Sequence, residues 1–421
     1  MNRDFGSTGA ERPRLLFLAQ MLPYPPDGGA SIRTYNVLRL LSRTFEVTAL
    51  CFYRWKPGYV KHDVGAAVRA LSEFAEVEAF PIPQEHSRLR RFRDHLLSTA
   101  SRRVYTYFTF ESKPYEKTLS DLLQERCFDL VHVDSLDLSY YFHLLDGNIP
   151  VVCTHHDVQS LLLARRAARQ TSLFMGAYLR LQSRLMEREE QRWCPRLSLN
   201  VAVSELDCQR LGKAAPGSRC TVVPNGVDTE YFRPGGGTEE GIVSVGGTSW
   251  FPNRDGLLYY TDEIAPLIQT LAPGVKTIWV GRANDDDIRA FGDVHGVQLT
   301  GYVEDVRPYI CDAACYVVPL RVGGGTRVKI LDAWSMGKAV VSTSLGCEGL
   351  DARDGENILV ADTPTDFADA VRRVLEDPEL RRGLGANARR TVQEQYSWDV
   401  IGEGLNRAYL DLFSSGETQE V

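Results

Sequence analysis

Long apolar runs, paired cysteines and an excess of positive charge are all missing from this sequence of 421 residues. No apolar run approaches the roughly 18 residues that a membrane-spanning helix needs, so none is expected. Acidic residues outnumber basic ones, 55 to 48, and the net charge of −7 argues against general affinity for nucleic acid. The composition is otherwise that of an ordinary globular protein, long enough for two domains or more.

The nine cysteines are scattered, and none forms a C-x-x-C pair. Their odd number and the lack of a secretory signal favour free thiols in the cytoplasm, a reducing compartment. Cys311 and Cys315 lie four residues apart with no histidine cluster nearby, so we expect core thiols there and no metal ligands. The others are Cys51, Cys127, Cys153, Cys194, Cys208, Cys220 and Cys347.

Strands and helices alternate along the chain, which predicts an α/β fold with parallel sheets. Residues 1–12 are polar and are expected to lack regular structure. The first half is predicted to contain strands at 14–20, 46–53, 76–81, 129–133, 150–154 and 198–203, and helices near 31–43, 113–126 and across much of 157–192.

A break follows at 224–240, where prolines, glycines and an Asn-Gly turn cluster. A second series then begins, which predicts a second α/β domain. Ligands in such sheets bind at the carboxyl ends of the strands, so a cleft between the two domains is the expected site. The second series comprises strands 241–246, 275–281, 297–300, 315–319 and 338–342, and helices 254–270, 305–312, 326–336, 364–376 and 378–394.

The stretch GGGTRVKILDAWSMG, residues 323–337, is the most informative in the chain. Its glycines lead into a helix predicted to open at Thr326, and a helix N-terminus offers unpaired N–H groups and partial positive charge. Gly324 and Gly325 allow a phosphate close to the backbone, and Arg327 and Lys329 add charge where a diphosphate would lie.

Asp332 lies three residues beyond Lys329 and therefore on the same helix face, where a carboxylate can accept hydrogen bonds from a ribose. The alternative is a solvated helix start after a flexible loop. The apolar residues Val328, Leu331 and Trp334 already supply the stripe that faces the core, which favours a functional interpretation of the charged residues.

Six segments occur in an order that resembles a glycosyltransferase of the GT-B fold, similar to the retaining family-4 group. The resemblance extends from residue 14 to about residue 400, and the ordered set is more specific than any single piece. The segments are PYPPDGG (23–29), VPNGVD (223–228), PN-x-D (252–255), GYVEDVRPYI (301–310), VPLRVGGGTRVKILDAWSMGKAVVSTSLGCEGL (318–350) and DGENILVADTPTDFADAVRRVLED.

The resemblance implies two Rossmann-like domains that face each other across a cleft. Residues 13–224 would form an acceptor-side domain, and 225–395 would bind the nucleotide sugar. A helix at 396–413 would pack back on the first domain. The implied activity is retaining, hexosyltransferase-like transfer from a nucleotide-diphosphate sugar to a glycan, lipid-linked or small-molecule acceptor, in polysaccharide or glycoconjugate biosynthesis. The family generally needs no metal, and the nucleotide sugar is a substrate, so no cofactor is implied.

Two departures from the family pattern stand out. Most members carry a glutamate eight residues before a second one, but here Gly324 replaces the first acid and Asp332 the second. Where the family often has a lysine after the first strand of the second domain, this chain has Asn253. The phosphate cations are then Arg327 and Lys329.

Further candidates lie at predicted strand ends. In the second domain these are candidate nucleotide or base contacts: Gly246, Gly247, Gly281, Arg282, Tyr302 and Val303. In the first domain, Gly28 and Gly29 precede a helix that carries Arg33 in its first turn, and this loop is either a cleft loop or a simple βα turn. His155 and His156 end the strand VVCTH, and the resemblance assigns a donor-sugar contact, and hence a catalytic role, to His156.

Residues 88–103, RLRRFRDHLLSTASRR, contain six arginines and one aspartate, with apolar residues at helical spacing. A basic amphipathic helix of this kind can lie on an anionic membrane, which would suit a lipid-linked acceptor and a peripheral location at the inner face. The alternative is a helix packed on its own domain with a solvated basic face.

Two other functions remain open at this stage. One is a sugar-nucleotide epimerase on the same double-domain fold, which the GGGTRVKILD and VPNGVD segments disfavour. The other is a catalytically inactive sugar-nucleotide-binding scaffold of an assembly complex, which the missing first acid suggests. Neither the donor sugar nor the base can be read from the sequence.

Overall fold

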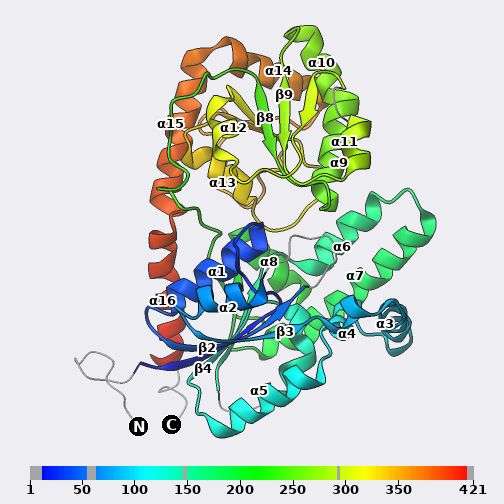
Figure 1. The fold of residues 1–421 in the computed structure, drawn as a ribbon, viewed down its shortest axis with the longest axis vertical. Coiled ribbons are helices and arrows are strands. Elements are labelled where there is room, and N and C mark those ends of the chain that lie inside the picture. The colour runs from blue at the N-terminus through cyan, green and yellow to red at the C-terminus, as the bar shows by residue number, and fades with distance from the viewer. Residues whose placement is uncertain (1–11, 55–62, 146–148, 292–293, 415–421) are drawn as a thin grey trace. The chain divides into compact units, whose positions relative to one another are not determined.

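The computed structural model describes residues 12–54, 63–145, 149–291 and 294–414. The chain forms two compact units, each with its own sheet (Figure 1). Unit 1 comprises Met1–Val223 and Gly402–Val421, and unit 2 comprises Pro224–Ile401. Except for its last residue, the segment 1–12 lies outside the described residues.

Unit 1 is built around a parallel sheet with the strand order β3-β2-β1-β4-β5-β6-β7. Its strands are β1 (Arg14–Ala19), β2 (Glu46–Tyr53), β3 (Glu76–Pro81), β4 (Leu130–Val133), β5 (Val151–His155), β6 (Leu199–Ala202) and β7 (Cys220–Val222). The helices are α1 (Gly29–Leu41), α2 (Val64–Leu71), α3 (Arg88–Ser101), α4 (Tyr105–Thr109), α5 (Lys113–Glu125), α6 (Gln159–Ala168), α7 (Leu173–Trp193) and α8 (Glu205–Ala214), with 3-10 turns η1 (Pro83–His86), η2 (Leu136–Leu144) and η3 (Cys194–Arg196).

Unit 2 repeats the plan, with the parallel order β10-β9-β8-β11-β12-β13. Its strands are β8 (Ile242–Val245), β9 (Thr277–Val280), β10 (Val297–Leu299), β11 (Cys315–Val318), β12 (Val340–Ser342) and β13 (Leu359–Val360). The helices are α9 (Phe251–Tyr259), α10 (Ala265–Leu271), α11 (Asp285–Phe291), α12 (Arg307–Asp312), α13 (Val328–Ser335), α14 (Pro364–Glu376) and α15 (Pro378–Gln395), and a π-turn, η4 (Tyr260–Ile264), joins α9 to α10. The last helix, α16 (Trp398–Ser414), starts in unit 2 and continues into unit 1.

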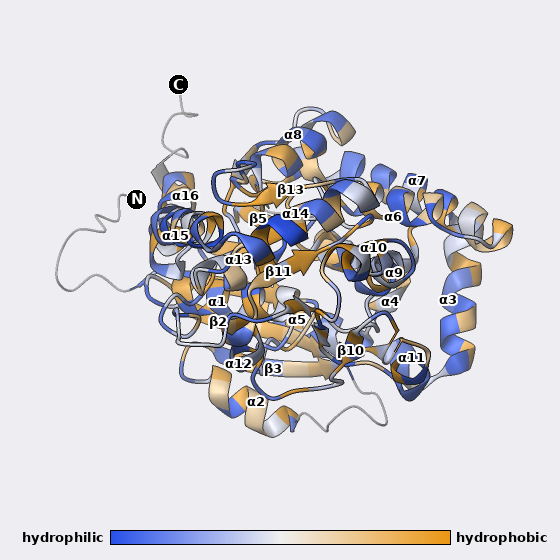
Figure 2. Ribbon diagram, turned by 90° about the horizontal axis from the view of Figure 1, so that it is seen from above, coloured by the Kyte–Doolittle hydropathy of each residue, from blue (hydrophilic) through white to orange (hydrophobic). Residues whose placement is uncertain are grey.

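Both faces of the unit 2 sheet are buried. Along β11, Cys315 and Val317 belong to one apolar cluster, whereas Tyr316 and Val318 belong to another. Successive side chains of a strand point to opposite faces, so each cluster lies on its own side of the sheet. This explains why the strands read as continuous apolar runs in the sequence, and Figure 2 shows them as hydrophobic ribbons surrounded by more polar helices.

Two helices near the end of unit 2 show how the local sequence sets a helix start. Thr363 precedes Pro364, and its Oγ1 accepts a hydrogen bond of 3.2 Å from the backbone N–H of Asp366. Asp377 precedes Pro378 and caps α15 in the same way. A side-chain acceptor followed by proline is a strong helix-start signal, and both helices were predicted with nearly these bounds.

Other expectations were coarser than the structure. The predicted helix 254–270 is divided into α9, η4 and α10, and the helical region 157–192 is divided into α6 and α7. Helices α2, α8 and α11 were not predicted. No helix within the described ranges is long and apolar enough to cross a membrane.

The expectation of nine free thiols is wrong for one pair. Cys208 on α8 and Cys220 on β7 form a disulfide, with their Cα atoms 5.9 Å apart. The error arose because spacing along the sequence does not show which helix packs beside which strand. The other seven cysteines are free, and Cys315 is a buried core thiol as expected.

The close approach of α15 to the end of α13 can be tested at Gly385. A Cβ added there would lie 2.0 Å from the carbonyl oxygen of Gly337, so Gly385→Ala forces the two segments apart. We expect the free energy of unfolding to fall by about 1–3 kcal/mol, as measured by urea denaturation.

Gly383→Ala is the matched control, since it lies in the same helix with no atom within 4 Å of the added Cβ. It should be neutral or stabilising by up to about 1 kcal/mol, because alanine is the better helix former. Equal losses in the two variants would show that close packing at Gly385 is not the cause.

Candidate active site

Each sheet has one point where the strand order reverses direction. In unit 1 it lies between β1 and β4, and in unit 2 between β8 and β11. In parallel α/β sheets the connections from such neighbouring strands leave toward opposite faces of the sheet, and ligands usually bind in the crevice at their carboxyl ends. The sequence candidates fall at these two places, and each unit is described by itself.

In unit 2, the glycine-rich loop leads into α13. This helix begins at Val328, so the predicted start at Thr326 is wrong. Arg327 is the N-cap with a non-helical ψ of 95°, and Gly325 has a φ of 62°, which favours glycine. Thr326 accepts a hydrogen bond of 2.7 Å from the side chain of Asn225, so the VPNGVD segment holds the loop in place.

The guanidinium of Arg327 turns back onto its own loop. It donates to the carbonyl oxygens of Gly324 and, at 2.6 Å, Gly325, and reaches that of Leu345 at 3.4 Å. The side chain is buried and holds the loop closed from inside. Its positive charge is therefore fixed beside the start of α13, whereas its direct contact with a phosphate stays a prediction.

Lys329 lies in the first turn of α13 and points to the carboxyl end of β8. Its Nζ donates a hydrogen bond of 2.8 Å to Oδ1 of Asn253, whose Nδ2 donates to the carbonyl oxygen of Gly247 at 3.1 Å. A Cβ on Gly246 would lie 2.6 Å from this Nζ. Glycine at 246 is what lets the ammonium reach the backbone at the strand end.

Lys329 and Asp332 perturb each other within this partly buried cluster. Burial lowers the pKa of Lys329 to about 7; the charge of Arg327 adds to this effect and that of Asp332 opposes it. Burial raises the pKa of Asp332 to about 8, against the pull of Lys329. The pair lies on one helix face, as the spacing predicted, and both protonation states change near neutral pH.

The backbone at the ends of β8 and β9 is packed too closely for side chains. A Cβ on Gly281 would lie 2.8 Å from both the carbonyl carbon of Gly246 and the nitrogen of Gly247. The indole N–H of Trp279 donates to the carbonyl oxygen of Gly246 at 2.9 Å and fixes this turn. The structure thus brings the three predicted glycines together beside Lys329.

Arg282 and Tyr302 extend the same edge of the sheet. The guanidinium carbon of Arg282 lies 4.8 Å from the centre of the exposed Tyr302 ring, a cation–π distance. Val303 is partly buried against the core of unit 2. A flat, exposed ring beside a cation is a surface on which a nucleobase can stack. The side chain of Val303 is apolar, so only its backbone groups could form hydrogen bonds with a base.

In unit 1, a buried carboxylate that the sequence interpretation missed lies at the carboxyl end of β4. Asp134 follows β4 directly and accepts a hydrogen bond of 2.6 Å from Thr34 on α1. Its other oxygen lies 3.6 Å from Nε2 of His132, whose Nδ1 lies 2.7 Å from the hydroxyl of Tyr409. Burial alone would raise the pKa of Asp134, but His156 and His132 outweigh it and hold the pKa well below its ordinary value.

The two adjacent histidines have different surroundings. His155 is buried, lies 2.9 Å from Oδ1 of Asn200, and has its pKa lowered to about 4 by burial, so it stays neutral. His156 is partly exposed, and its Nε2 lies 2.9 Å from the carbonyl oxygen of Asp134 and 3.4 Å from the carboxylate. A carbonyl oxygen only accepts, so Nε2 of His156 carries a proton.

The predicted glycine loop starts α1 beside this cluster. Gly28 is the N-cap, Gly29 is the first helical residue, and Ser31 Oγ closes the turn through hydrogen bonds to both backbone groups of Gly28. Arg33 is buried, not solvated, and its pKa is lowered to about 10 by burial, with Asp134 opposing the shift. Its charge therefore belongs to the histidine–carboxylate cluster.

Two site residues were missed or undervalued from sequence. Asn253 was noted only as a departure from the family lysine, yet it positions Lys329. Asp134 had a usable signal, because it follows a predicted strand directly and therefore had to lie at the carboxyl edge. Its partner Thr34 is 100 residues away, and only the fold brings them together.

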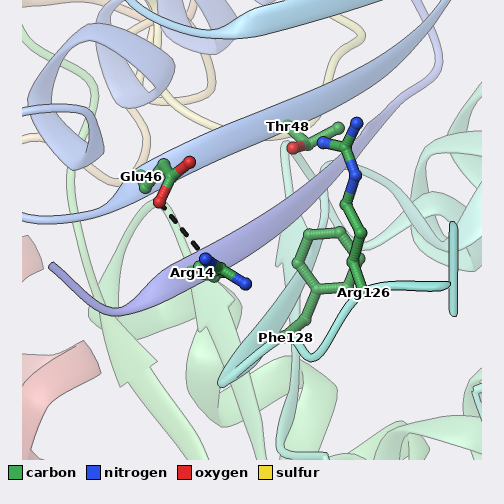
Figure 3. A pocket seen from close by; sticks show the side chains of 5 residues that line it. All are labelled: Arg14, Glu46, Thr48, Arg126 and Phe128. Carbon is green, nitrogen blue, oxygen red and sulfur yellow. Dashed lines mark ion pairs between the residues drawn. The ribbon is translucent and has the colours of Figure 1, made fainter. Parts of the chain in front are cut away.

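A separate hollow of about 230 Å³ lies at the opposite, amino ends of β1 and β2 (Figure 3). Its charged side chains already pair: Arg14 lies 3.5 Å from Glu46, and Arg126 bonds to Glu76. It is remote from the strand ends that collect the candidates. No group of three or more His, Cys, Asp or Glu residues suited to a metal occurs among the residues that the structure describes.

Comparison with known proteins agrees with this architecture. The model described as Glycosyltransferase Family 4 matches residues 27–231, and the model described as Glycosyl transferases group 1 matches residues 239–377. An uncharacterized 44.6 kDa protein from the cps region of Klebsiella pneumoniae is 26% identical over 163 residues. The match covers 37% of this chain and 42% of that relative's length.

Solved structures share the whole fold at low identity. HepE of Anabaena in complex with UDP and glucose superposes with a TM-score of 0.66 and 15% identity, over 95% of this chain and 100% of that one. A glycosyltransferase from Rickettsia africae gives 0.64 and 11%, over 96% and 99%. TarM of S. aureus, solved with UDP, gives 0.62 and 12%, over 95% and 99%.

The architecture is that of two Rossmann-like α/β domains, so the predicted fold class is confirmed. The chain belongs to the GT-B glycosyltransferases, with the family-4 model in its first half and the group 1 model in its second.

The mutual influence of Lys329 and its neighbours can be measured directly. Because Asp332 stabilises the ammonium and Arg327 destabilises it, Asp332→Asn should lower the pKa of Lys329 further and Arg327→Gln should raise it. Both can be followed by NMR pH titration after 13C-methylation of the lysines, with the signal assigned by its loss in Lys329→Met. A pKa near the ordinary lysine value in the unaltered protein would contradict the buried arrangement.

Proposed function

We propose that this protein transfers a sugar from a nucleoside-diphosphate donor to a hydroxyl group of an acceptor, with retention of anomeric configuration. The acceptor is a glycan, a lipid-linked or a small molecule, and the pathway is polysaccharide or glycoconjugate biosynthesis. The bond from the anomeric carbon to the diphosphate oxygen breaks, a bond to the acceptor oxygen forms, and the proton of the acceptor hydroxyl passes to the departing diphosphate. The donor binds unit 2, and unit 1 holds the acceptor side.

The observation that carries this proposal is the position of Lys329. Its ammonium lies beside the open backbone of Gly246, in the first turn of α13, at the switch point of a parallel sheet. A helix start, a nearby second cation at Arg327 and glycines without side chains together suit a diphosphate. Asp332 on the same face is assigned to the ribose, and the ring of Tyr302 to the base.

The proposed chemistry needs no cofactor, because the groups named above can carry the charge of the leaving diphosphate. Fixed donors aimed at developing charge are each worth about 3 kcal/mol in enzymes where one has been removed. The oxocarbenium character of the sugar in such reactions calls for an electron-rich neighbour. We assign that contact to the ring of His156, which the Asp134 backbone and carboxylate orient.

The alternative function is a scaffold that binds the nucleotide sugar without catalysis. It is suggested by Gly324, which stands where most family members have an acid. Such a scaffold would bind the donor at the same site as a transferase but would not transfer the sugar. An epimerase would instead change the sugar of the nucleotide without an acceptor. Donor binding, transfer and donor isomerisation therefore need separate measurements.

Lys329→Met tests the donor site. UDP is the first nucleotide to use, since HepE and TarM were solved with it. Loss of a charge-assisted hydrogen bond should weaken UDP binding by roughly 1.5–3 kcal/mol in calorimetry. The exposed Lys276→Met is the matched control in unit 2, and equal affinity in both variants would place the phosphate site elsewhere.

The same experiment has a pH signature. A diphosphate favours the protonated lysine, so affinity should be full below the lowered pKa of about 7 and fall as the pH rises through it. Binding should take up protons near neutral pH, seen as a buffer-dependent binding enthalpy that Lys329→Met abolishes.

His156→Ala tests the transfer step. If the imidazole acts mainly on the transition state, UDP affinity should be unchanged while kcat and kcat/KM fall together. We expect a loss of at least about tenfold, equivalent to ~1.4 kcal/mol. The assay is UDP release from donor sugar plus acceptor, and NMR of the product reports whether the anomeric configuration is retained.

His155→Ala separates structure from chemistry at the neighbouring position. It leaves the buried Oδ1 of Asn200 without its partner, so it should lower the free energy of unfolding by about 1–3 kcal/mol. Wild-type turnover in His156→Ala would remove the catalytic assignment. A wild-type protein that binds UDP tightly but releases none from donors with acceptors of its pathway would favour the scaffold.

A further inference from the structure

Helix α3 is amphipathic, but its polar side faces the domain and its apolar side faces outward. The residues that it buries are polar, Asp94 and Ser98. Its large apolar side chains face outward: Leu89 is 82% exposed, Phe92 72% and Leu96 61%. They recur three and four residues apart, as one stripe of a helix does. The helix packs on its own domain with a solvated basic face, as one alternative had it, but it does so through its polar side and leaves its apolar stripe exposed.

Polar contacts with α7 hold α3 in this orientation. Nδ1 of His95 lies 2.5 Å from the hydroxyl of Tyr178, and Nε2 of Gln182 donates to Oγ of Ser98 at 2.9 Å. Figures 1 and 2 show α3 beside α7 at the same margin of unit 1. Because the inner face is fixed by specific hydrogen bonds, the apolar stripe cannot turn inward without breaking them.

The start of α7 adds a second exposed apolar group. Leu173 is 89% exposed and Phe174 92%, and Met175 beside them is also exposed. Phe174 precedes Tyr178 by one turn and so lies on the helix face that contacts α3. Five large apolar side chains are thus displayed by two helices that touch each other.

The charge around these side chains is mostly positive, although the whole chain is acidic. Glu111 lies beside α3, and its carboxylate pairs with Arg90 and Arg93. On α3, the only acid, Asp94, is buried and pairs with Arg90 and Arg93. Among the residues that the structure describes, no carboxylate pairs with the exposed arginines at 88, 91 and 102. Residues 169–186 contain three exposed arginines and no acid.

We propose that Leu89, Phe92, Leu96, Leu173 and Phe174, together with the arginines beside them, form a docking surface for an anionic lipid bilayer. Large exposed apolar groups rimmed by polar residues mark interaction sites. Arginines favour one kind of occupant, since their guanidinium groups pair with lipid phosphates while the apolar side chains enter the acyl boundary. A second copy of this basic surface would instead bring like charges together.

Vesicle co-sedimentation of the full-length protein tests the surface. Vesicles of phosphatidylcholine with phosphatidylglycerol should bind the protein at low salt, and vesicles of pure phosphatidylcholine should bind it far less. Arg88→Glu with Arg91→Glu should reduce the anionic-vesicle partition by about fivefold or more for each charge removed. The effect should shrink at high salt, where exposed charges are screened.

Two serine variants test the apolar part from separate segments. Phe92→Ser and Phe174→Ser should each reduce partition about tenfold or more, while UDP affinity and unfolding midpoint stay as in wild type. Leu271→Ser and Arg373→Glu, exposed residues of unit 2, are the matched controls and should bind vesicles normally. Vesicle binding does not require turnover, so this test is independent of the transfer assay.

A fluorescent variant tests the surface through a new signal and does not depend on the loss of vesicle binding. Phe92→Trp should show a blue-shifted emission on anionic vesicles, and Leu271→Trp should not. Absence of vesicle binding by wild type, or equal binding by the serine variants, would overturn the proposal. So would self-association in the ultracentrifuge that Phe92→Ser and Phe174→Ser abolish without any vesicle binding, which would assign the surface to a second copy.

Discussion

Burial of a parallel sheet on both faces is the constraint on which this structure depends. With apolar clusters on each side of β11, polar side chains can collect only at the strand ends. At one point of each sheet the order of the strands reverses, and ligands of parallel α/β sheets usually bind at that point. Lys329 with its glycines occupies one such point, and Asp134 with its histidines occupies the other. The fold therefore dictates where chemistry can occur before any residue type is considered.

At each of these two points, specific neighbours determine whether a buried group carries a charge. Asp134 remains ionised because two histidines and a threonine hydroxyl offset the cost of burial. Lys329 differs from Asp134, because its hydrogen-bond partner Asn253 is neutral and burial is the largest effect on its pKa. The pKa of Lys329 is therefore lowered to about 7. A stable carboxylate suits an orienting role, and a poised ammonium suits a site whose charge is completed by an anionic ligand.

The sequence was sufficient where the relevant contacts are local or periodic. Strand and helix alternation, the Thr363 and Asp377 helix starts, and the glycines at strand ends all follow from short-range rules. It failed where long-range packing decides. Asp134 and Thr34 meet only through the sheet, the Cys208–Cys220 pair requires knowing that α8 lies beside β7, and the periodicity of α3 gave the stripe but not the side that faces the domain. The start of α13 was misplaced because Arg327 is drawn into the loop carbonyls.

In the proposed function, glycine at position 324 in place of the usual acid would affect donor binding and sugar transfer differently. A carboxylate at this position would stand next to Arg327 and close to the start of α13, where it would offset part of the positive charge that attracts a diphosphate. Glycine leaves that charge intact and contributes a carbonyl oxygen to the Arg327 guanidinium instead. If the donor binds as proposed, we expect the replacement to leave phosphate binding intact and any loss to fall on recognition of the sugar. It follows that nucleotide affinity alone cannot distinguish an active transferase from a scaffold, and that the balance between them rests on groups outside this loop, with His156 the first of them.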